Sequence, residues 1–211
     1  AGWIIRQSIS LKSRFFRSQV VASGGEVEIY RHLAEKIIAL PPEIFTQTNW
    51  KIASAMLERV FEIIGPGGNI LDLYGGFGYF GLNYAISSGG RGLVIDSVAS
   101  AISAGRRFAG EHNLQVEFTC ADLNRKLPAN LTGGKYDAVI IDPPRSGIGK
   151  NVLRFSGKKA PGKIIYISCH PAALARDMGR LRNNYRVSRF HLFDLFPQTP
   201  ELETIAELEV L

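Results

Sequence analysis

From residue 49 onward, short apolar runs alternate with stretches of helical periodicity. The apolar runs cover residues 69–74, 92–95, 116–119, 136–141 and 163–168, and the helical stretches cover 79–87, 97–112, 147–155 and 171–181. Both faces of each run are apolar, which is typical of strands buried in a parallel sheet. This succession predicts an open, doubly wound α/β sheet, in which ligands bind beyond the carboxyl ends of the strands.

A helix precedes the first run, and two strand-like runs end the chain. Thr48 or Asn49 can cap the helix, and the glycine-rich segment 65–68 stops it. The runs at 185–193 and 204–211 are joined by a proline-bearing loop without a helix, so they must pair antiparallel or nearly so. We therefore expect a mostly parallel seven-stranded sheet with a terminal antiparallel strand. The apolar stripe of the first helix consists of Ile52, Met56, Val60 and Ile63.

The first 40 residues have a weaker pattern. We interpret residues 3–9 as a strand and the amphipathic stretch that ends near Leu40, before two prolines, as a helix. This change of character predicts a small lead-in subdomain over residues 1–40 and the main catalytic domain over 41–211. Because residue 1 is Ala and not Met, the chain can be an excised piece of a longer one.

Composition limits the class of protein. Of 211 residues, 45% are hydrophobic and 21% charged, which suits one globular domain. No run approaches the ~20 apolar residues of a spanning helix, and the start lacks a signal-peptide pattern, so we expect a soluble, cytoplasmic protein without a membrane partner. Cys120 and Cys169 are too few for a disulfide scaffold or a four-cysteine cluster, and we expect no metal. The net charge of +6 is compatible with a polyanionic partner.

A glycine loop, LDLYGGFGYFGL, joins the first apolar run to a helix. Gly76, Gly78 and Gly81 satisfy the dinucleotide pattern G-x-G-x-x-G, and Asp96 follows about 20 residues later, as a ribose-binding carboxylate should. Asp122, after the third strand, is placed to meet an adenine amino group, with a solvated loop aspartate as the alternative. The loop predicts a ribose-bearing cofactor and does not choose between NAD and S-adenosylmethionine.

The fourth strand ends in Asp142-Pro143-Pro144-Arg145. Two prolines fix the local backbone and cannot continue a strand. In amino-group methyltransferases the residue after the prolines is aromatic and stacks on the base, whereas arginine better serves a phosphate or a base carbonyl. This sequence therefore favours a reaction other than methylation of an exocyclic amine.

Cys169 ends the fifth strand, and Pro171 begins the next helix. A helix N-terminus lowers the pKa of a nearby thiol from about 8.5, and the thiolate is the reactive form. A strand cysteine is more often a small buried hydrophobe, which is how we interpret Cys120. Beside the glycine loop and Asp-Pro-Pro-Arg, Cys169 is instead a candidate nucleophile.

Glu201 and Glu203 open the last strand and, two residues apart, face the same side. A like-charge neighbour raises the pKa of one carboxyl, which suits a base that works near neutral pH. The alternative is a solvated acidic cluster that also includes Glu207 and Glu209.

These segments resemble the uracil-C5 methyltransferases of transfer and ribosomal RNA over roughly residues 40–211. FTQTN resembles the family's Phe-x-Gln-x-Asn, and the glycine loop resembles its Asp-Leu-Tyr/Phe-Cys-Gly-x-Gly. DPPRSG matches as it stands, SCHPAALARD resembles Ser-Cys-Asn-Pro-x-Thr-Leu-Ala-Arg-Asp, and FPQTPELE resembles Phe-Pro-x-Thr-x-His-x-Glu. The resemblance implies a Rossmann-like class I methyltransferase fold, S-adenosylmethionine as cofactor and tRNA or rRNA as substrate.

The resemblance also implies roles for particular residues. Cys169 adds to C6 of a uridine, C5 takes the methyl group, and Glu203 removes the C5 proton. Arg145, Phe77 and Tyr79 are candidates for receiving a uridine that is turned out of its stack. Cofactor contacts are implied for Gln47, Tyr74, Asp96 and Asp142.

Four positions depart from the family pattern. Gly75 replaces a cysteine, Tyr79 and His170 replace asparagines, and Glu201 replaces a histidine. We expect the first to be harmless and the other three to affect substrate choice and pH dependence more than reaction type. The family's N-terminal RNA-binding barrel and cysteine-bound cluster have no counterpart in this sequence.

Rival functions explain less of the sequence. Cytosine-C5 methyltransferases resemble a pattern with a second cysteine in the Asp-Pro-Pro-like segment, which this chain lacks. An NAD-dependent oxidoreductase leaves Cys169 and Asp-Pro-Pro-Arg unexplained. A non-catalytic RNA-binding module would account for the departures, although Cys169 and Glu203 count against it. Basic clusters at 14–17 and 158–159 suit RNA contact or ordinary surface equally.

Overall fold

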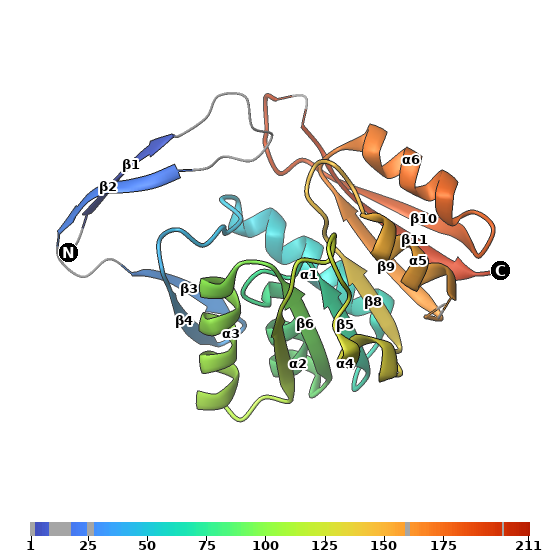
Figure 1. The fold of residues 1–211 in the computed structure, drawn as a ribbon, viewed down its shortest axis with the longest axis horizontal. Coiled ribbons are helices and arrows are strands. Elements are labelled where there is room, and N and C mark those ends of the chain that lie inside the picture. The colour runs from blue at the N-terminus through green and yellow to red at the C-terminus, as the bar shows by residue number, and fades with distance from the viewer. Residues whose placement is uncertain (1–2, 9–17, 25–27, 159–160, 200) are drawn as a thin grey trace.

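The computed structural model describes residues 3–8, 18–24, 28–158, 161–199 and 201–211. Within these residues, seven strands form one sheet in the order β10-β11-β9-β8-β5-β6-β7 (Figure 1). Strands β9, β8, β5, β6 and β7 are parallel to one another. Strand β11 is antiparallel to both β9 and β10. The predicted sheet and its terminal antiparallel strand are confirmed. The strands are β5 (Asn69–Leu73), β6 (Arg91–Asp96), β7 (Val116–Cys120), β8 (Ala138–Ile141), β9 (Lys163–Ser168), β10 (Tyr185–Phe193) and β11 (Glu203–Val210).

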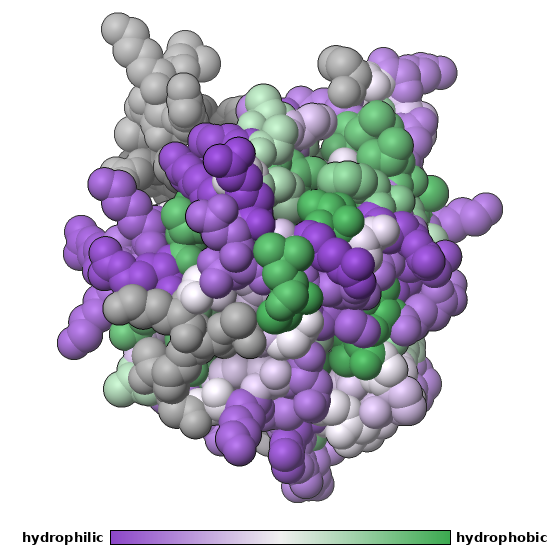
Figure 2. Space-filling model, turned by 90° about the vertical axis from the view of Figure 1, so that its right-hand side faces the viewer, coloured by the Kyte–Doolittle hydropathy of each residue, from purple (hydrophilic) through white to green (hydrophobic). Residues whose placement is uncertain are grey.

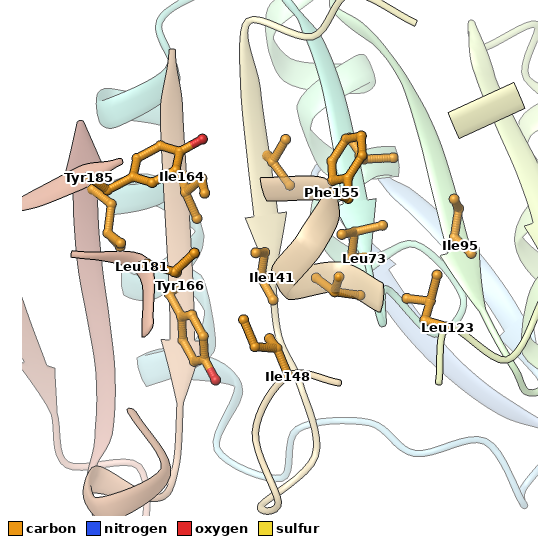
Figure 3. Close-up of a cluster of buried hydrophobic side chains, with 14 of the residues drawn as sticks. Leu73, Ile95, Leu123, Ile141, Ile148, Phe155, Ile164, Tyr166, Leu181 and Tyr185 are labelled. Carbon is orange, nitrogen blue, oxygen red and sulfur yellow. The ribbon is translucent and has the colours of Figure 1, made fainter. Parts of the chain in front are cut away.

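Helices cover both faces of this sheet (Figure 1). One face packs against α1 (Trp50–Ile64), α2 (Tyr79–Ser88) and α3 (Ala99–Glu111). The other packs against α4 (Ala129–Gly133), α5 (Lys150–Lys158) and α6 (Pro171–Leu181). The close-up in Figure 3 shows the apolar cluster of the second face, where side chains from β5, β8 and β9 meet those of α5 and α6. Apolar side chains on both faces explain why the strands read as continuous apolar runs.

The first helix begins where the sequence predicted. The Asn49 side chain accepts a hydrogen bond from the Ile52 N–H at 3.3 Å, so Asn49 and not Thr48 is the N-cap. The expected stripe is largely confirmed, because Met56, Val60 and Ile63 are buried. Gly65 ends the helix with φ of 82°, a conformation that glycine adopts readily.

The helix expected before Leu40 is wrong. The structure has an antiparallel hairpin there, β3 (Ile29–Leu33) and β4 (Lys36–Leu40), which contacts α2 and α3. Ile29, Leu33 and Ile37 have helical spacing, yet Ile37 is 55% exposed while Leu33 is fully buried. The hairpin is favoured because it buries Leu33, Ile38 and Leu40 together against the helices.

The strand expected at residues 3–9 corresponds to β1 (Trp3–Ser8), which pairs antiparallel with β2 (Ser18–Gly24), a strand that the sequence did not predict. The basic cluster at 14–17 lies outside the described residues, as does Lys159 of the second cluster.

Figure 2 shows the face that carries β10 and α6, where hydrophobic and hydrophilic residues are interspersed. Exposed apolar side chains of β10 include Phe190 at 54% and Leu192 at 67%. Across the described ranges, no helix has the length and apolar character needed to cross a membrane.

Candidate active site

Three strands bring the predicted reactive residues to one edge of the sheet. Asp142 follows β8, Cys169 follows β9, and Glu203 is the first residue of the antiparallel β11. Ser168 faces Thr204 in the β9–β11 pair, so continuing the register by one residue places Cys169 opposite Glu203. The parallel strands end where the antiparallel strand begins, and the topology therefore gathers residues that are far apart in the sequence.

Glu203 is a buried carboxylate with only 7% of its surface exposed. Its Oε2 has no hydrogen-bond partner among the described residues. The pKa of Glu203 is raised to about 7, first by burial and then by the charge of Glu201, while Arg145 opposes both effects. A carboxyl with this pKa can take up and release a proton near neutral pH, as the sequence predicted for one member of this glutamate pair.

The Cys169 thiol is half-buried. Cys120, which we interpreted from the sequence as a small buried hydrophobe, is exposed, and that interpretation is wrong because β7 is the outermost strand of the sheet. Burial raises its pKa, the Glu203 carboxylate raises it further, the Arg145 guanidinium lowers it, and Asp142 raises it. The sequence had led us to expect a lowered pKa from the start of α6, and that expectation is wrong. Desolvation and two carboxylates from neighbouring strands raise the thiol pKa by more than Arg145 and a backbone hydrogen bond lower it.

Arg145 links both sides of this edge. Its guanidinium forms an ion pair with Glu201 and also lies within hydrogen-bonding reach of Cys169. Glu201, whose charge acts on Glu203, is thereby connected to the thiol through one arginine. The arginine is the cationic group that favours the thiolate.

The glycine loop turns sharply between β5 and α2. Tyr74, Gly76 and Gly78 have φ of 63°, 58° and 88°, so the loop needs left-handed conformations at three positions. A Cβ on Gly76 would meet no atom within 4 Å, which leaves open space on the loop. Asp96 accepts hydrogen bonds from the N–H groups of Gly76 at 3.0 Å and Val98 at 2.8 Å.

Asp72 is a further site residue to which the sequence assigned no role. It is fully buried, accepts a hydrogen bond from the Gly81 N–H at 3.1 Å, and burial raises its pKa to about 7. A Cβ on Gly75 would lie 2.7 Å from the Asp72 Cγ. Gly75 therefore permits a close approach that the cysteine of the family pattern would disturb.

A pocket adjoins the glycine loop and the start of α1. It brings together Gln47, Tyr74 and Asp142, for which the resemblance implied cofactor contacts, and Gly76 of the glycine loop. The Gln47 Oε1 and the Tyr74 hydroxyl are buried without partners in the described part of the chain. The pKa of Asp142 is raised to about 8, mainly by burial and further by the charges of Glu203 and Asp96. The remaining lining residues are Phe45, Thr46, Trp50, Ala53, Met56, Gly75, Phe77, Tyr79 and Phe80.

Asp96 and Asp122 lie outside this set of lining residues. Asp96 still touches the pocket wall through Gly76. Asp122 is an exposed residue that accepts a hydrogen bond from the Asn124 N–H at 2.9 Å and lies 3.7 Å from the Arg125 Nε. These contacts are local, and the exposed side chain is compatible with both interpretations from the sequence.

Two of the departures have clear structural roles. The His170 Nδ1 accepts a hydrogen bond from the Ala173 N–H at 3.2 Å and so caps α6, a task that asparagine also performs. Tyr79 packs edge-on against Trp50, with ring centroids 5.6 Å apart, and lines the pocket. Phe77, a candidate for receiving the uridine, is only 4% exposed and belongs to the apolar core.

The sheet order, the glycine loop and the acidic edge together define the Rossmann-like fold of class I methyltransferases. The Trm5b structure from Pyrococcus abyssi shares this fold at 13% identity and a TM-score of 0.67. The family model for tRNA (uracil-5-)-methyltransferases matches residues 6–210. This chain belongs to that family.

Two curated relatives are 34% identical to this chain. They are the tRNA (uracil(54)-C(5))-methyltransferase of Pyrococcus abyssi and the 23S rRNA (uracil(1939)-C(5))-methyltransferase of Shewanella frigidimarina. The matches cover 91% and 86% of this chain and 47% and 41% of the relatives, so the chain spans less than half of their length. The crystal structure of the P. abyssi tRNA (uracil-54, C5)-methyltransferase with S-adenosyl-L-homocysteine superposes with a TM-score of 0.78 at 32% identity. The superposition covers 94% of this chain and 48% of the P. abyssi chain.

Proposed function

We propose that this chain transfers a methyl group from S-adenosylmethionine to C5 of a uridine in tRNA or rRNA through a covalent bond between Cys169 and C6. The observation that carries the proposal is that Cys169 directly follows Ser168, which pairs with Thr204, and that Glu203, Asp142 and Arg145 all act on the pKa of its thiol. Relatives that methylate uracil C5 in both RNA classes support the reaction and leave the RNA open. We assign catalysis to residues 41–211, a lead-in role to 1–40, and the cytoplasm as the location.

The pocket suits S-adenosylmethionine. Aromatic side chains of Trp50 and Tyr79 offer apolar walls, and the unpartnered Gln47 Oε1 and Tyr74 hydroxyl offer polar contacts. The open space over Gly76 permits the close approach of a ligand to the loop backbone. When bound, the cofactor supplies an electrophilic methyl group. We assign its contacts to Gln47, Tyr74, Gly76, Gly78, Asp96 and Asp142, and the adenine amino group to Asp122.

Cys169 activates the ring, because C5 of uracil is too electron-poor to attack a methyl sulfonium unaided. The thiolate forms a bond to C6, and the C5–C6 π pair moves toward C5 and O4. C5 then bonds to the methyl carbon as the methyl–sulfur bond breaks, which would leave S-adenosylhomocysteine. The surrounding carboxylates raise the thiol pKa and Arg145 lowers it, so Arg145 beside the sulfur favours the nucleophilic form. An arginine in this place also suits the charge that develops on O4.

Glu203 completes the reaction. Its carboxylate takes the C5 proton, the electron pair re-forms the C5–C6 double bond, and the C6–S bond breaks to release the Cys169 thiolate. The unpartnered Oε2 is free to accept this proton, and a pKa of about 7 matches the task.

The proposal is tested with RNA whose uridines carry tritium at C5. The wild type should release one tritium for each methyl group incorporated, Cys169→Ala should release none, and Glu203→Gln should be slowed by roughly 10²–10⁴-fold. Cys120→Ser, which changes the exposed cysteine, should retain the wild-type rate.

Methyl incorporation without tritium release would exclude C5 as the target. Cofactor and RNA binding without methyl transfer would instead support a non-catalytic RNA-binding module. The departures at Tyr79, His170 and Glu201 would then account for the loss of activity.

A further inference from the structure

A buried carboxylate outside the reacting edge joins three segments of the fold. Asp177 lies in α6 with 0% exposure. Its Oδ2 accepts hydrogen bonds from the Ile148 N–H and the Tyr166 hydroxyl, both at 2.8 Å. Its Oδ1 accepts from the Arg176 Nε at 3.0 Å and Nη2 at 2.9 Å. The Arg180 Nη1 also donates to Oδ1, at 3.4 Å. A carboxylate desolvated to this degree persists only where donors satisfy it, and here five donor groups do so.

Arg176 carries the linkage to the loop after β8. Its Nη2 also donates a hydrogen bond to the Ser146 carbonyl at 2.6 Å. Gly147 has φ of 79°, and a Cβ at this position would collide with both the Asp177 carboxylate and the Arg176 guanidinium. The backbone of this loop is therefore pressed directly against the pair.

The anchored loop is the one that presents Arg145. The Gly147 N–H donates to the Pro144 carbonyl at 2.7 Å, so Arg145 occupies the second position of a tight turn. Arg176 holds Ser146, the third residue of that turn, and Asp177 holds Ile148, the residue directly after it. The hydrogen bond within the turn and the contact of Ser146 with Arg176 both restrain the turn backbone. They therefore restrict the direction in which the Arg145 side chain leaves the backbone.

The same carboxylate also holds the strand that carries the nucleophile. Tyr166 lies in β9, three residues before Cys169. Its pKa is raised mainly by burial and also by the hydrogen bond to Asp177, so the hydroxyl keeps its proton and remains a donor. Figure 3 shows the Tyr166 and Ile148 side chains at the same end of the apolar cluster. Asp177 thus has one contact on each of the segments that deliver Arg145 and Cys169.

We propose that Arg176 and Asp177 are positioning residues that fix the Arg145 guanidinium relative to the Cys169 sulfur. The inference rests on the proposed function, because it assigns the pair to the activation of the nucleophile. Loss of the pair releases the turn, and Arg145 moves away. Burial and the carboxylates of Glu203 and Asp142, which disfavour the thiolate, are then opposed only by a backbone hydrogen bond, and the pKa of the Cys169 thiol rises.

The kinetic test compares Asp177→Asn and Arg176→Lys with the wild type. Asparagine lacks the charge and the second acceptor oxygen, and lysine lacks the fork that reaches both Asp177 and Ser146. We expect kcat to fall by roughly 10–100-fold, the cost of misplacing a reacting group by about 1 Å, while the Kd for S-adenosylhomocysteine changes less than about twofold. Arg176 is exposed, so its variant folds even if Asp177→Asn does not.

Tyr185→Phe is the matched control. The Tyr185 hydroxyl is buried in the same cluster but donates to the carbonyls of Ser156 at 3.1 Å and Pro161 at 3.2 Å, away from the reacting edge. It should lower the free energy of unfolding and leave kcat unchanged. An equal fall in kcat for Tyr185→Phe would reduce Asp177 to a structural residue.

A second readout does not depend on methyl transfer. In a Cys120→Ser background, the rate at which iodoacetamide alkylates Cys169 is measured as a function of pH. The midpoint of this curve reports the pKa of the Cys169 thiol. The midpoint should move to higher pH in Asp177→Asn, Arg176→Lys and Arg145→Ala, and stay in place in Tyr185→Phe. Unchanged midpoints in the first two variants would overturn the inference, whether or not the chain methylates uridine.

Discussion

The guanidinium of Arg145 forms an ion pair with Glu201, and so the turn after β8 is joined to the loop that opens β11. The same guanidinium reaches Cys169, while Glu201 acts on the pKa of Glu203. One pair thereby couples the proposed nucleophile to the proposed base. The predictions below examine this coupling and the parts of the fold that support it.

Replacement of Glu201 should change the pH dependence of the reaction. Glu201→Gln removes a negative charge that raises the pKa of Glu203, so the acidic limb of the kcat profile should move to lower pH. Single-turnover rates between pH 5 and about 9 measure the shift. Glu209→Gln, at the far end of the same strand, is the control and should leave the profile in place. A Glu201→Gln profile that superposes on that of the wild type would show that Glu201 has no effect on the pKa of the base.

Asp72 should make the protein less stable as the pH rises. Its pKa is raised from 3.8 to about 7 by burial, so the folded state holds a proton that the unfolded state has lost between these values. The stabilisation is fully present below about pH 4 and is lost as the pH rises through about 7, with an upper limit on the order of 4 kcal/mol. Relative to the wild type, Asp72→Asn should gain free energy of unfolding between pH 5 and 8 in denaturant titrations. A constant difference at both pH values would refute the shift.

Gly75 should resist substitution despite its place in a loop. Gly75→Ala puts a Cβ 2.7 Å from the Asp72 Cγ, and we expect a loss of about 1–3 kcal/mol in the free energy of unfolding. Gly110 in α3 is the comparison, because a Cβ there meets nothing within 4 Å. Gly110→Ala should stabilise by about 0.4–1 kcal/mol. Equal effects of the two variants in urea denaturation would show that the Asp72 side chain moves away from the new Cβ with no loss in the free energy of unfolding.

His170 should be exchangeable for asparagine and not for alanine. His170→Asn retains an acceptor for the Ala173 N–H, whereas His170→Ala removes it and should cost about 0.5–2 kcal/mol. Thermal unfolding of the two variants measures the difference. Identical transitions would mean that the cap contributes nothing to α6.

The sequence predicted those parts of the fold that depend on local periodicity. β5, β8 and β9 are buried on both faces, and their apolar runs are visible without tertiary information. The β3–β4 hairpin was missed because Ile29, Leu33 and Ile37 have helical spacing, and only packing against α2 and α3 decides between helix and hairpin.

The candidate site was predicted as a set of residues, but its electrostatics were not. The pKa of Cys169 depends on Glu203 and Asp142, which come from other strands, so a local argument from the helix terminus gave the wrong sign. Asp177 was missed because its partners lie in the turn after β8 and in β9. The ordered similarity to family motifs was the signal that identified the remaining residues.

The covalent bond between Cys169 and the uracil ring is the central claim, and the most direct measurement is the mass of the denatured protein after incubation with S-adenosylmethionine and RNA containing 5-fluorouridine. Fluorine at C5 cannot leave as a proton, so elimination is blocked and the adduct persists. The account predicts that peptide mapping finds the methylated nucleotide on the peptide that contains Cys169, and that Cys169→Ala shows no adduct. An unmodified Cys169 in protein that methylates uridine, or an adduct on Cys120, would contradict it.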